Sequence, residues 1–390
     1  MALLSVLLHS NHHLGAHLGA QGRGMSLLVG PPGSPSQRVL CVVLALERCP
    51  GLLSLPLAQS FAASPEVRAV IPLAFGDSIG NARVLATDLR WFSDGPGRGV
   101  PFAAGGPFRA DPQALTAIIR ELRTGLRDPT AVEPAFDVVL GATAAVDLNA
   151  TIGTVVETQH GHAAAARTHD VSVGFRVVGV LAPAGPAIDQ LVLTDLASFY
   201  AIPDHASALL ANGDPGVTAA LIQPRPGVHK ARLLPELQGR SDISVADVPA
   251  ELLRLQDLLA PFTEVGGWLG GLVVACGVVG VAATFWVSLE GRRGEFAVLR
   301  LIGLQPLHLM GLLCAESAVL AGLGATSGLG LAHLALFAFP GPLAWDPFLW
   351  LPQEFVALAC VPLAACLGAS LPAAMATRRP LRGELGDHSA

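Results

Sequence analysis

The sequence contains one lysine, Lys230, among its 24 basic residues, and this scarcity excludes a large class of ATP-binding proteins. A P-loop requires lysine between glycine and serine or threonine, whereas Lys230 follows His229. The chain therefore has no Walker A loop of its own. Charged residues of all kinds make up only 14% of the chain, and the net charge is −6. Because basic residues are not in excess, nucleic acid is excluded as a partner.

Cysteine is also scarce, with six in 390 residues, so a disulfide framework is not expected. Four of the six lie in apolar runs, where a thiol acts as a small hydrophobic group: Cys276, Cys314, Cys360 and Cys366. Only Cys41 and Cys49 could pair, and we expect two unpaired thiols.

Apolar residues, in contrast, are abundant, at 52% of the chain with a mean hydropathy of +0.54. Residues 265–289 and 355–377 contain no charged residue and no histidine. A third run between them is interrupted only by His308, Glu316 and His333. About 20 apolar residues suffice to cross a bilayer as a helix. The pattern predicts an α-helical transmembrane bundle over residues 265–390, with spans at about 265–289, 309–337 and 355–377.

The distribution of arginine predicts the orientation of these spans. Arg292, Arg293 and Arg300 lie between the first two spans, and Arg378 and Arg379 follow the third. No lysine or arginine occurs between residues 301 and 377. Short loops rich in basic residues stay in the cytoplasm. We therefore expect the loop at 340–354, and the whole segment before residue 264, on the outer side.

Residues 25–264 have the sequence pattern of an α+β domain. Short β-rich runs and amphipathic stretches are separated by glycine, proline and aspartate. The predicted strands cover 67–75, 82–88, 137–141, 171–182 and 217–222, and the predicted helices 36–46, 112–126 and 248–259. Gly76-Asp77-Ser78-Ile79-Gly80 spells G-x-S-x-G, but β-like sequence follows it instead of a helix. We interpret it as a hairpin turn.

Residues 1–24 begin with a short apolar run that is too short to span a bilayer and lacks a preceding basic region. A large outer domain needs a helix on its N-terminal side to cross the membrane. We interpret residues 1–24 as the remnant of a first transmembrane helix and a linker, with the helix beginning upstream.

The segment 287–320, VSLEGRRGEFAVLRLIGLQPLHLMGLLCAESAVL, resembles the signature of the FtsX-like/MacB-like permease family. Glu295, Leu299, Arg300, Gly303 and Glu316 match its positions one by one. The glycines of the next span and the closing residues 371–380 are also similar. The outer domain resembles one branch of the family at 28–35, 71–77 and 177–189, whereas the family's first helix is missing.

The resemblance implies the membrane subunit of an ATP-binding-cassette system in the bacterial plasma membrane. Such a multi-pass permease works with a separate ATPase subunit, as a homodimer or with a paralogous permease. It passes force to the outer domain for export, efflux or lipoprotein release. The remaining partners would be membrane lipid and a periplasmic protein. The chain would be no enzyme and would carry no cofactor, since ATP binds to the partner.

Three groups of residues are candidate sites within the helical part. Residues 292–303 are interpreted as a coupling helix for the ATPase, with Glu295 and Arg300 as polar contacts and Phe296, Val298, Leu299 and Ile302 as apolar ones. Gly303 completes this segment. Glu316 is expected to fix helix packing rather than to handle ions or protons. Close helix approach is predicted at four glycines: Gly266, Gly270, Gly324 and Gly328.

A histidine cluster in the outer domain, His160, His162 and His169, could hold Zn²⁺ on a loop, although a solvated loop explains it as well. The histidines at positions 9, 12, 13 and 17 are set aside because they lie in the segment that we interpret as truncated. The alternative function is a membrane-anchored metal-binding receptor, or a hydrolase using Ser78, without an ATPase partner.

Overall fold

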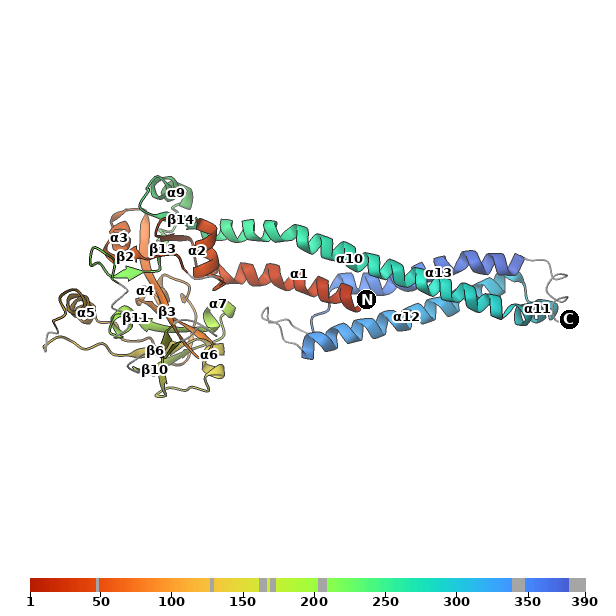
Figure 1. The fold of residues 1–390 in the computed structure, drawn as a ribbon, viewed down its shortest axis with the longest axis horizontal. Helices are drawn as coiled ribbons and strands as arrows, with labels where there is room; N and C mark the ends of the chain where they lie inside the picture. The colour runs from red at the N-terminus through yellow and green to blue at the C-terminus, as the bar shows by residue number, and fades with distance from the viewer. Residues whose placement is uncertain are drawn as a thin grey trace. The chain divides into compact units, whose positions relative to one another are not determined.

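The computed structural model describes residues 1–46, 49–126, 130–160, 167–168, 173–202, 209–338 and 348–378. The chain divides into two units (Figure 1). One comprises residues 17–256 and contains every strand among the described residues; the other comprises residues 1–16 and 257–390, and its described elements are helices. Below they are called the α/β unit and the helical unit.

The α/β unit is built on one large sheet in which two halves share a long strand. The first half runs in the order β14 (Ser244–Asp247), β1 (Leu27–Gly30), β13 (Ala219–Pro224) and β3 (Val67–Ile79). The second continues from β3 through β4 (Ala82–Thr87), β11 (Leu191–Asp195), β6 (Asp137–Leu140), β10 (Gly174–Leu181) and β5 (Phe102–Gly105). The same sheet includes the shorter strands β7 (Val155–Glu157), β8 (Gln159–His160) and β9 (Arg167–Thr168). Strands β2 (Leu53–Ser54) and β12 (Gly216–Val217) form a separate two-stranded sheet.

Strand β3 joins the two halves because it pairs with β13 along its beginning and with β4 along its end. The β3–β4 register shifts between Phe75 and Ser78, where an irregularity re-aims the strand. Each half has its own apolar core, one around Leu27, Val70 and Phe199 and the other around Val138 and Phe175. The unit thus has two cores on one continuous sheet.

Most helices of this unit are short and begin where a polar side chain caps them. They are α2 (Pro35–Val42), α3 (Leu55–Ser60), α4 (Arg90–Ser93), α5 (Pro112–Thr124), α6 (Ala142–Asp147), α7 (Pro186–Asp189), α8 (Leu196–Tyr200) and α9 (Lys230–Gln238), with a 3₁₀ turn at Phe61–Ala63. Asp111 accepts a hydrogen bond from the amide of Gln113 at the start of α5. Gly125, with φ of 68°, ends that helix in the left-handed conformation.

The sheet contains both orientations: β4–β11 and β6–β10 are parallel pairs, and most others are antiparallel. Helices do not alternate strictly with strands, so the predicted α+β class is confirmed. The G-x-S-x-G segment runs through the end of β3 into the β3–β4 turn, where Gly80 has φ of 56°. Ser78 is a buried strand residue there. The hairpin interpretation is confirmed, and the strand-to-helix elbow of a hydrolase is not formed.

The expectation for Cys41 and Cys49 was wrong, because the structure joins them in a disulfide with their Cα atoms 5.2 Å apart. Cys41 lies near the end of α2, and the chain reverses after that helix, where the amide of Leu46 donates to the carbonyl oxygen of Leu40 at 2.9 Å. Sequence spacing alone could not show this reversal.

The helical unit contains the start of α1 (Ala2–Gln21), most of α10 (Val248–Gly291), and α11 (Arg293–Leu301), α12 (Pro306–Ala338) and α13 (Pro352–Arg378). Among the described residues, three helices are long and apolar enough to cross a membrane: α10, α12 and α13. These contain the three predicted spans. The amphipathic stretch predicted at 248–259 is continuous with the first span in α10.

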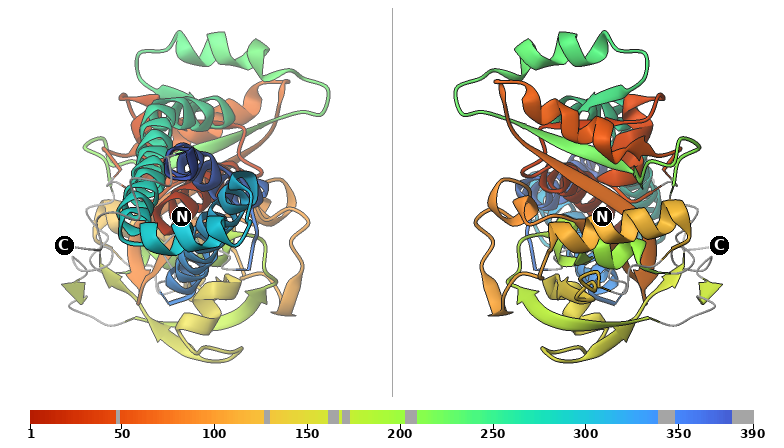
Figure 2. Two further views of the ribbon diagram at one scale, coloured as in Figure 1. Left: turned by 90° about the vertical axis from the view of Figure 1, so that its right-hand side faces the viewer. Right: turned by 90° about the vertical axis from the view of Figure 1, so that its left-hand side faces the viewer.

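Helix α12 buries one face along its length, and the rest of its apolar surface is exposed. The buried residues recur every three or four positions: Leu309, Leu313, Ser317, Ala321, Ala325, Leu329, Ala332 and Leu336. This spacing is one stripe of an α-helix. The helical unit is seen from its end in the left panel of Figure 2, with α10, α12 and α13 gathered around the N-terminus. Exposed leucine and valine on the other faces suit a lipid environment.

Candidate functional site

The predicted coupling segment forms α11, a short helix between α10 and α12. It begins after Arg292, which interrupts the helical backbone with φ of −104° and ψ of 15°. It ends before Gly303, whose φ of 104° lies in a region that glycine adopts readily. Pro306 then starts α12. The two breaks set α11 apart as a separate element between two long apolar helices.

One face of α11 packs against the chain's own helices. Phe296 is 7% exposed and lies in a cluster with Leu309, Leu313 and Ala369. Leu299 is partly buried against the same cluster. These two side chains, predicted as apolar contacts for a partner, therefore anchor α11 to α12 and α13. They connect the segment mechanically to the helices behind it.

The opposite face of α11 exposes apolar side chains. Val298, Leu301 and Ile302 are all exposed, and Ile302 is 76% exposed. Val298 and Ile302 belong to the predicted docking set, whereas the sequence analysis did not single out Leu301. On a helical wheel, positions 296 and 299 lie on one side and positions 298, 301 and 302 on the other, so the two faces could have been separated from the sequence. The exposed group Val298, Leu301 and Ile302 is called the outer face below.

Charged side chains bracket the start of α11. Arg292 Nε donates to Glu295 Oε2 at 3.0 Å, and Arg292 Nη1 lies 3.6 Å from Glu316 Oε1. The hydrogen bond to Glu295 raises the pKa of Arg292, and the charges of Glu295 and Glu316 add to this effect. The guanidinium also lies 5.8 Å from the centre of the Phe296 ring. Arg292 thus links α11 to α12.

Glu316 is 45% exposed in α12 and faces the α10–α11 junction through Arg292. This ion pair links Glu316 to the α10–α11 junction, and its role in fixing helix packing stays a prediction. Arg300 is half-buried on α11 and has a partner of its own. The polar residues of the segment therefore interact within the chain.

The predicted glycine contacts differ from one another. A Cβ at Gly266 would meet Leu7 at 3.3 Å, and a Cβ at Gly270 would meet Leu4 at 3.1 Å. A Cβ at Gly328 would meet Met1 at 3.1 Å. At Gly324 it would meet nothing within 4 Å. Three of the four glycines thus allow close approach of α1. The sequence did not predict α1 as their packing partner.

The predicted zinc site at His160, His162 and His169 lies outside the described residues, apart from the backbone of His160. That backbone pairs with Asp77 of β3 and Arg167 of β9. The metal assignment of these three residues stays a prediction.

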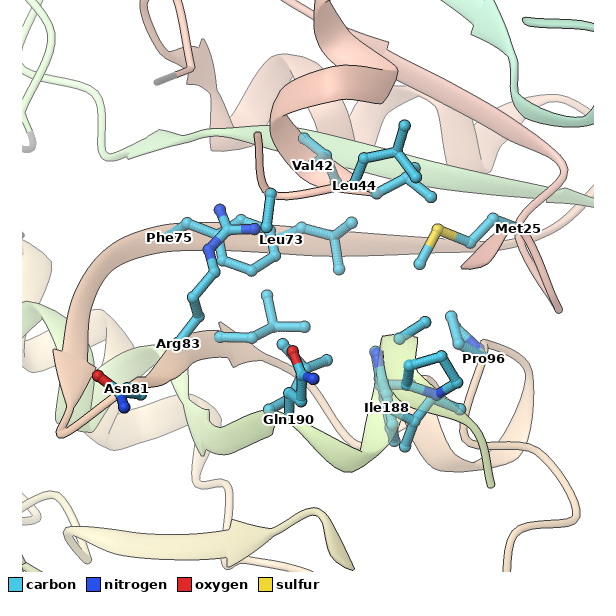
Figure 3. A pocket seen from close by; sticks show the side chains of 17 residues that line it. Met25, Val42, Leu44, Leu73, Phe75, Asn81, Arg83, Pro96, Ile188 and Gln190 are labelled. Atoms are coloured by element: carbon cyan, nitrogen blue, oxygen red, sulfur yellow. The ribbon is translucent and has the colours of Figure 1, made fainter. Parts of the chain in front are cut away.

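The α/β unit holds a cavity of about 100 Å³ between the end of α2, strands β3 and β4, and α7 (Figure 3). Arg83 reaches into it, 4.2 Å from the centre of the Phe75 ring, and donates to the carbonyl oxygen of Cys41 at 3.2 Å. Burial lowers the pKa of Arg83 to about 10, so it stays charged at neutral pH. Drug-sized ligands need roughly 300 Å³ or more. The cavity is too small for such a ligand.

An α/β unit joined to helices long and apolar enough to cross a membrane defines a membrane protein with a large domain outside the bilayer core. Residues 268–380 match the family described as FtsX-like permease C-terminal. The resemblance of residues 287–320 to this permease family is confirmed by this match. The match contains the exposed outer face, its inner anchors and Glu316.

A comparison with curated proteins gives no match. Among solved structures, the chain is similar to the periplasmic region of MacB from Actinobacillus actinomycetemcomitans, with 13% identity, coverage of 60% of this chain and 94% of that one, and a TM-score of 0.35. It is also similar to the extracellular domain of the noncanonic ABC-type transporter YknZ from Gram-positive bacteria. There the identity is 10%, the coverage 57% and 98%, and the TM-score 0.30.

Proposed function

We propose that this chain is the permease subunit of an ATP-binding-cassette transporter. It couples ATP hydrolysis by a separate ATPase subunit to movement of the α/β unit, for export, efflux or lipoprotein release. The match of residues 268–380 to the FtsX-like permease family carries the proposal. The lone Lys230 outside any P-loop is consistent with ATP binding by a partner.

The proposed orientation in the bacterial plasma membrane puts α11 in the cytoplasm and the α/β unit outside. Arginine supports this orientation, because Arg292, Arg293 and Arg300 all lie at α11. The disulfide between Cys41 and Cys49 also supports it, since disulfides persist in oxidising compartments such as the periplasm. Two independent features thus favour the same side for the α/β unit.

Force transmission requires packed elements that join the docking surface to the helices. On α11 the outer face is free for a partner, and Phe296 and Leu299 on the inner side contact α12 and the end of α13. The ion pair of Arg292 with Glu316 adds a second link to α12. Force applied to the outer face would therefore be transmitted to α12 and α13. We further propose that the permease works as a dimer, with itself or a paralogue.

Replacing Ile302 with Asp tests the docking surface. If the outer face is buried against the ATPase, the charge is desolvated and docking weakens by several kcal/mol. We expect the ATPase no longer to co-purify with the membrane complex and transport-dependent growth to fail. The variant should remain in the membrane, because Ile302 is exposed and is not part of the chain's own core.

Leu126→Asp is the matched control, since Leu126 is an exposed apolar residue of the α/β unit, 74% exposed against 76% for Ile302. It should leave ATPase association unchanged. If the chain purifies without any ATPase, a membrane-anchored receptor without an ATPase partner gains support. If the ATPase co-purifies equally well with Ile302→Asp, the outer face of α11 is not the docking surface.

A further inference from the structure

Three titratable side chains from distant parts of the chain meet in the helical unit: His9 of α1, His333 of α12 and Glu354 of α13. One ligand atom of each lies within 4.8 Å of the others. His9 is 0% and Glu354 1% exposed, and His333 is largely buried. The cluster lies where α12 ends and α13 begins. No sequence pattern connects these three residues, and His9 was set aside with the other N-terminal histidines.

Both histidines approach the same carboxylate oxygen. His9 Nδ1 and His333 Nε2 each lie 3.5 Å from Glu354 Oε1. A good N–H···O hydrogen bond is about 2.7–3.2 Å long, so these separations are too long for strong direct bonds. Two ligand atoms about 2.0–2.1 Å from a tetrahedral zinc ion lie roughly 3.3 Å apart. The two nitrogen–oxygen separations are close to the spacing of ligand atoms around a shared cation.

The hydrogen bond of the second ring nitrogen of His9, Nε2, is independent evidence that His9 is a metal ligand. His9 Nε2 lies 2.9 Å from the carbonyl oxygen of Leu349, and as its N–H donor it leaves the lone pair on Nδ1. Metal-binding histidines characteristically donate their other N–H to a carbonyl or carboxylate. Nδ1 also lies 3.0 Å from the carbonyl oxygen of Ser5. In the tautomer with the proton on Nε2, the lone pair of Nδ1 faces these oxygens, and a cation bound to Nδ1 would offset their repulsion.

The remaining ligands are held in place from outside the cluster. Glu354 Oε2 accepts the amide of Leu351 at 3.0 Å, and Oε1 accepts the hydroxyl of Ser5. The His333 ring stacks on Trp350, with centroids 4.5 Å apart. Each ligand is therefore oriented by a second group, as expected for a preorganised metal site. Two histidines and one glutamate form a donor set that binds Zn²⁺ and leaves a fourth position for water.

We propose that His9, His333 and Glu354 bind one Zn²⁺ ion. The ion would link α1 to α12 and α13, near the end of α12 and the start of α13. The site is distinct from the His160, His162 and His169 cluster predicted in the α/β unit, and it does not depend on an ATPase partner.

The full-length chain in detergent, freed of metal by a chelator, tests the proposal. All measurements use a background in which His160, His162 and His169 are alanine, so that this second cluster cannot contribute. We expect one Zn²⁺ per chain by metal analysis. Co²⁺ should give the intense visible absorption of a four-coordinate site, and Zn²⁺ should raise the thermal unfolding temperature.

His9→Ala and His333→Ala should each weaken Zn²⁺ binding by at least about 100-fold and abolish both effects. Glu354→Gln should do the same while keeping an oxygen for the Leu351 amide, so that loss of folding is not the cause. Matched controls are His12→Ala on α1 and His308→Ala on α12, both exposed, which should leave binding unchanged.

A parent chain that takes up no stoichiometric zinc overturns the proposal and leaves a hydrogen-bonded histidine–glutamate cluster. Undiminished binding and an unchanged Co²⁺ spectrum in His333→Ala and Glu354→Gln overturn it as well. Neither result bears on ATPase association, so failure here is distinguishable from failure of the proposed transport function.

Discussion

Asp195 is a buried carboxylate at the N-terminus of α8, and its surroundings have opposite effects on its charge. Burial raises its pKa, while hydrogen bonds from Ser198 and from the amides of Ala197 and Ser198 act to lower it. Burial is the largest effect, so the native state binds a proton more tightly than the unfolded chain does. Its contribution to stability therefore falls as pH rises from 3.8 through the raised value.

Two substitutions at Asp195 separate the cap from the charge. Asp195→Asn keeps a good N-cap and removes the buried charge, so we expect it to match or exceed the parent in stability at neutral pH. That advantage should shrink as the pH is lowered through the raised pKa of the parent carboxylate, because the parent then loses its buried charge. Asp195→Ala should lose about 1–2 kcal/mol at neutral pH because amides at the helix start lose their acceptor.

The measurement is thermal unfolding of the chain in detergent at several pH values, together with hydrogen exchange of the α8 amides. An Asp195→Asn variant that is less stable than the parent at neutral pH, with a deficit that shrinks in acid, would show that the charged form stabilises α8.

At the scale of elements, α1 and α10 approach each other through glycine. Gly270 faces Leu4 and Leu7 of α1, whereas a Cβ at the neighbouring Gly271 would meet nothing within 4 Å. Small residues at a helix interface bring the two backbones together, and larger ones force them apart. The pair offers a comparison of two adjacent residues on the same helix, only one of which faces the contact.

Replacing Gly270 with Leu should therefore weaken the α1–α10 contact, with a cost of about 1–3 kcal/mol from overpacking. Gly271→Leu is the matched control and should leave intrachain stability unchanged. Thermal unfolding and protease cleavage of α1 in the detergent-solubilised chain check the difference. Equal behaviour of the two variants would mean that α1 does not pack against this face of α10. A Gly271→Leu chain that alone loses dimers would instead assign its face to the subunit interface.

At the scale of the whole molecule, the proposed topology predicts which residues a membrane-impermeant thiol reagent reaches. Gly106 in the α/β unit and Gly291 at the end of α10 are suitable probes, because an added Cβ meets nothing within 4 Å at either position. In a background without the four free cysteines, we expect Gly106→Cys to be labelled on intact cells from the outside. Gly291→Cys should react only after the membrane is opened.

Permeabilised cells provide the control, since both cysteines should then react. Labelling of Gly291→Cys on intact cells would reverse the orientation inferred from arginine. It would also place α11 on the side opposite to any cytoplasmic ATPase, and so contradict the proposed coupling directly.

Local features of the sequence were sufficient to predict the three apolar helices, the charged segment between two of them, and the α+β character of residues 25–264. Hydropathy, the alternation of apolar residues in strands, and helix start and stop signals each depend on a few neighbouring residues. They can therefore be recognised from the sequence alone. The G-x-S-x-G hairpin belongs to the same group, because the β-like residues that follow it decide its structure. The resemblance of residues 287–320 also rested on contiguous positions.

The tertiary structure alone decided which residues meet across the chain. The pairing of Cys41 with Cys49 depends on a chain reversal after α2, and the inward position of Phe296 depends on how α11 lies against α12. Ser5 and Glu354, 349 positions apart, share a hydrogen bond beside the two histidines. Composition and spacing cannot bring such residues together, because only the packing of whole helices fixes the distances between their side chains.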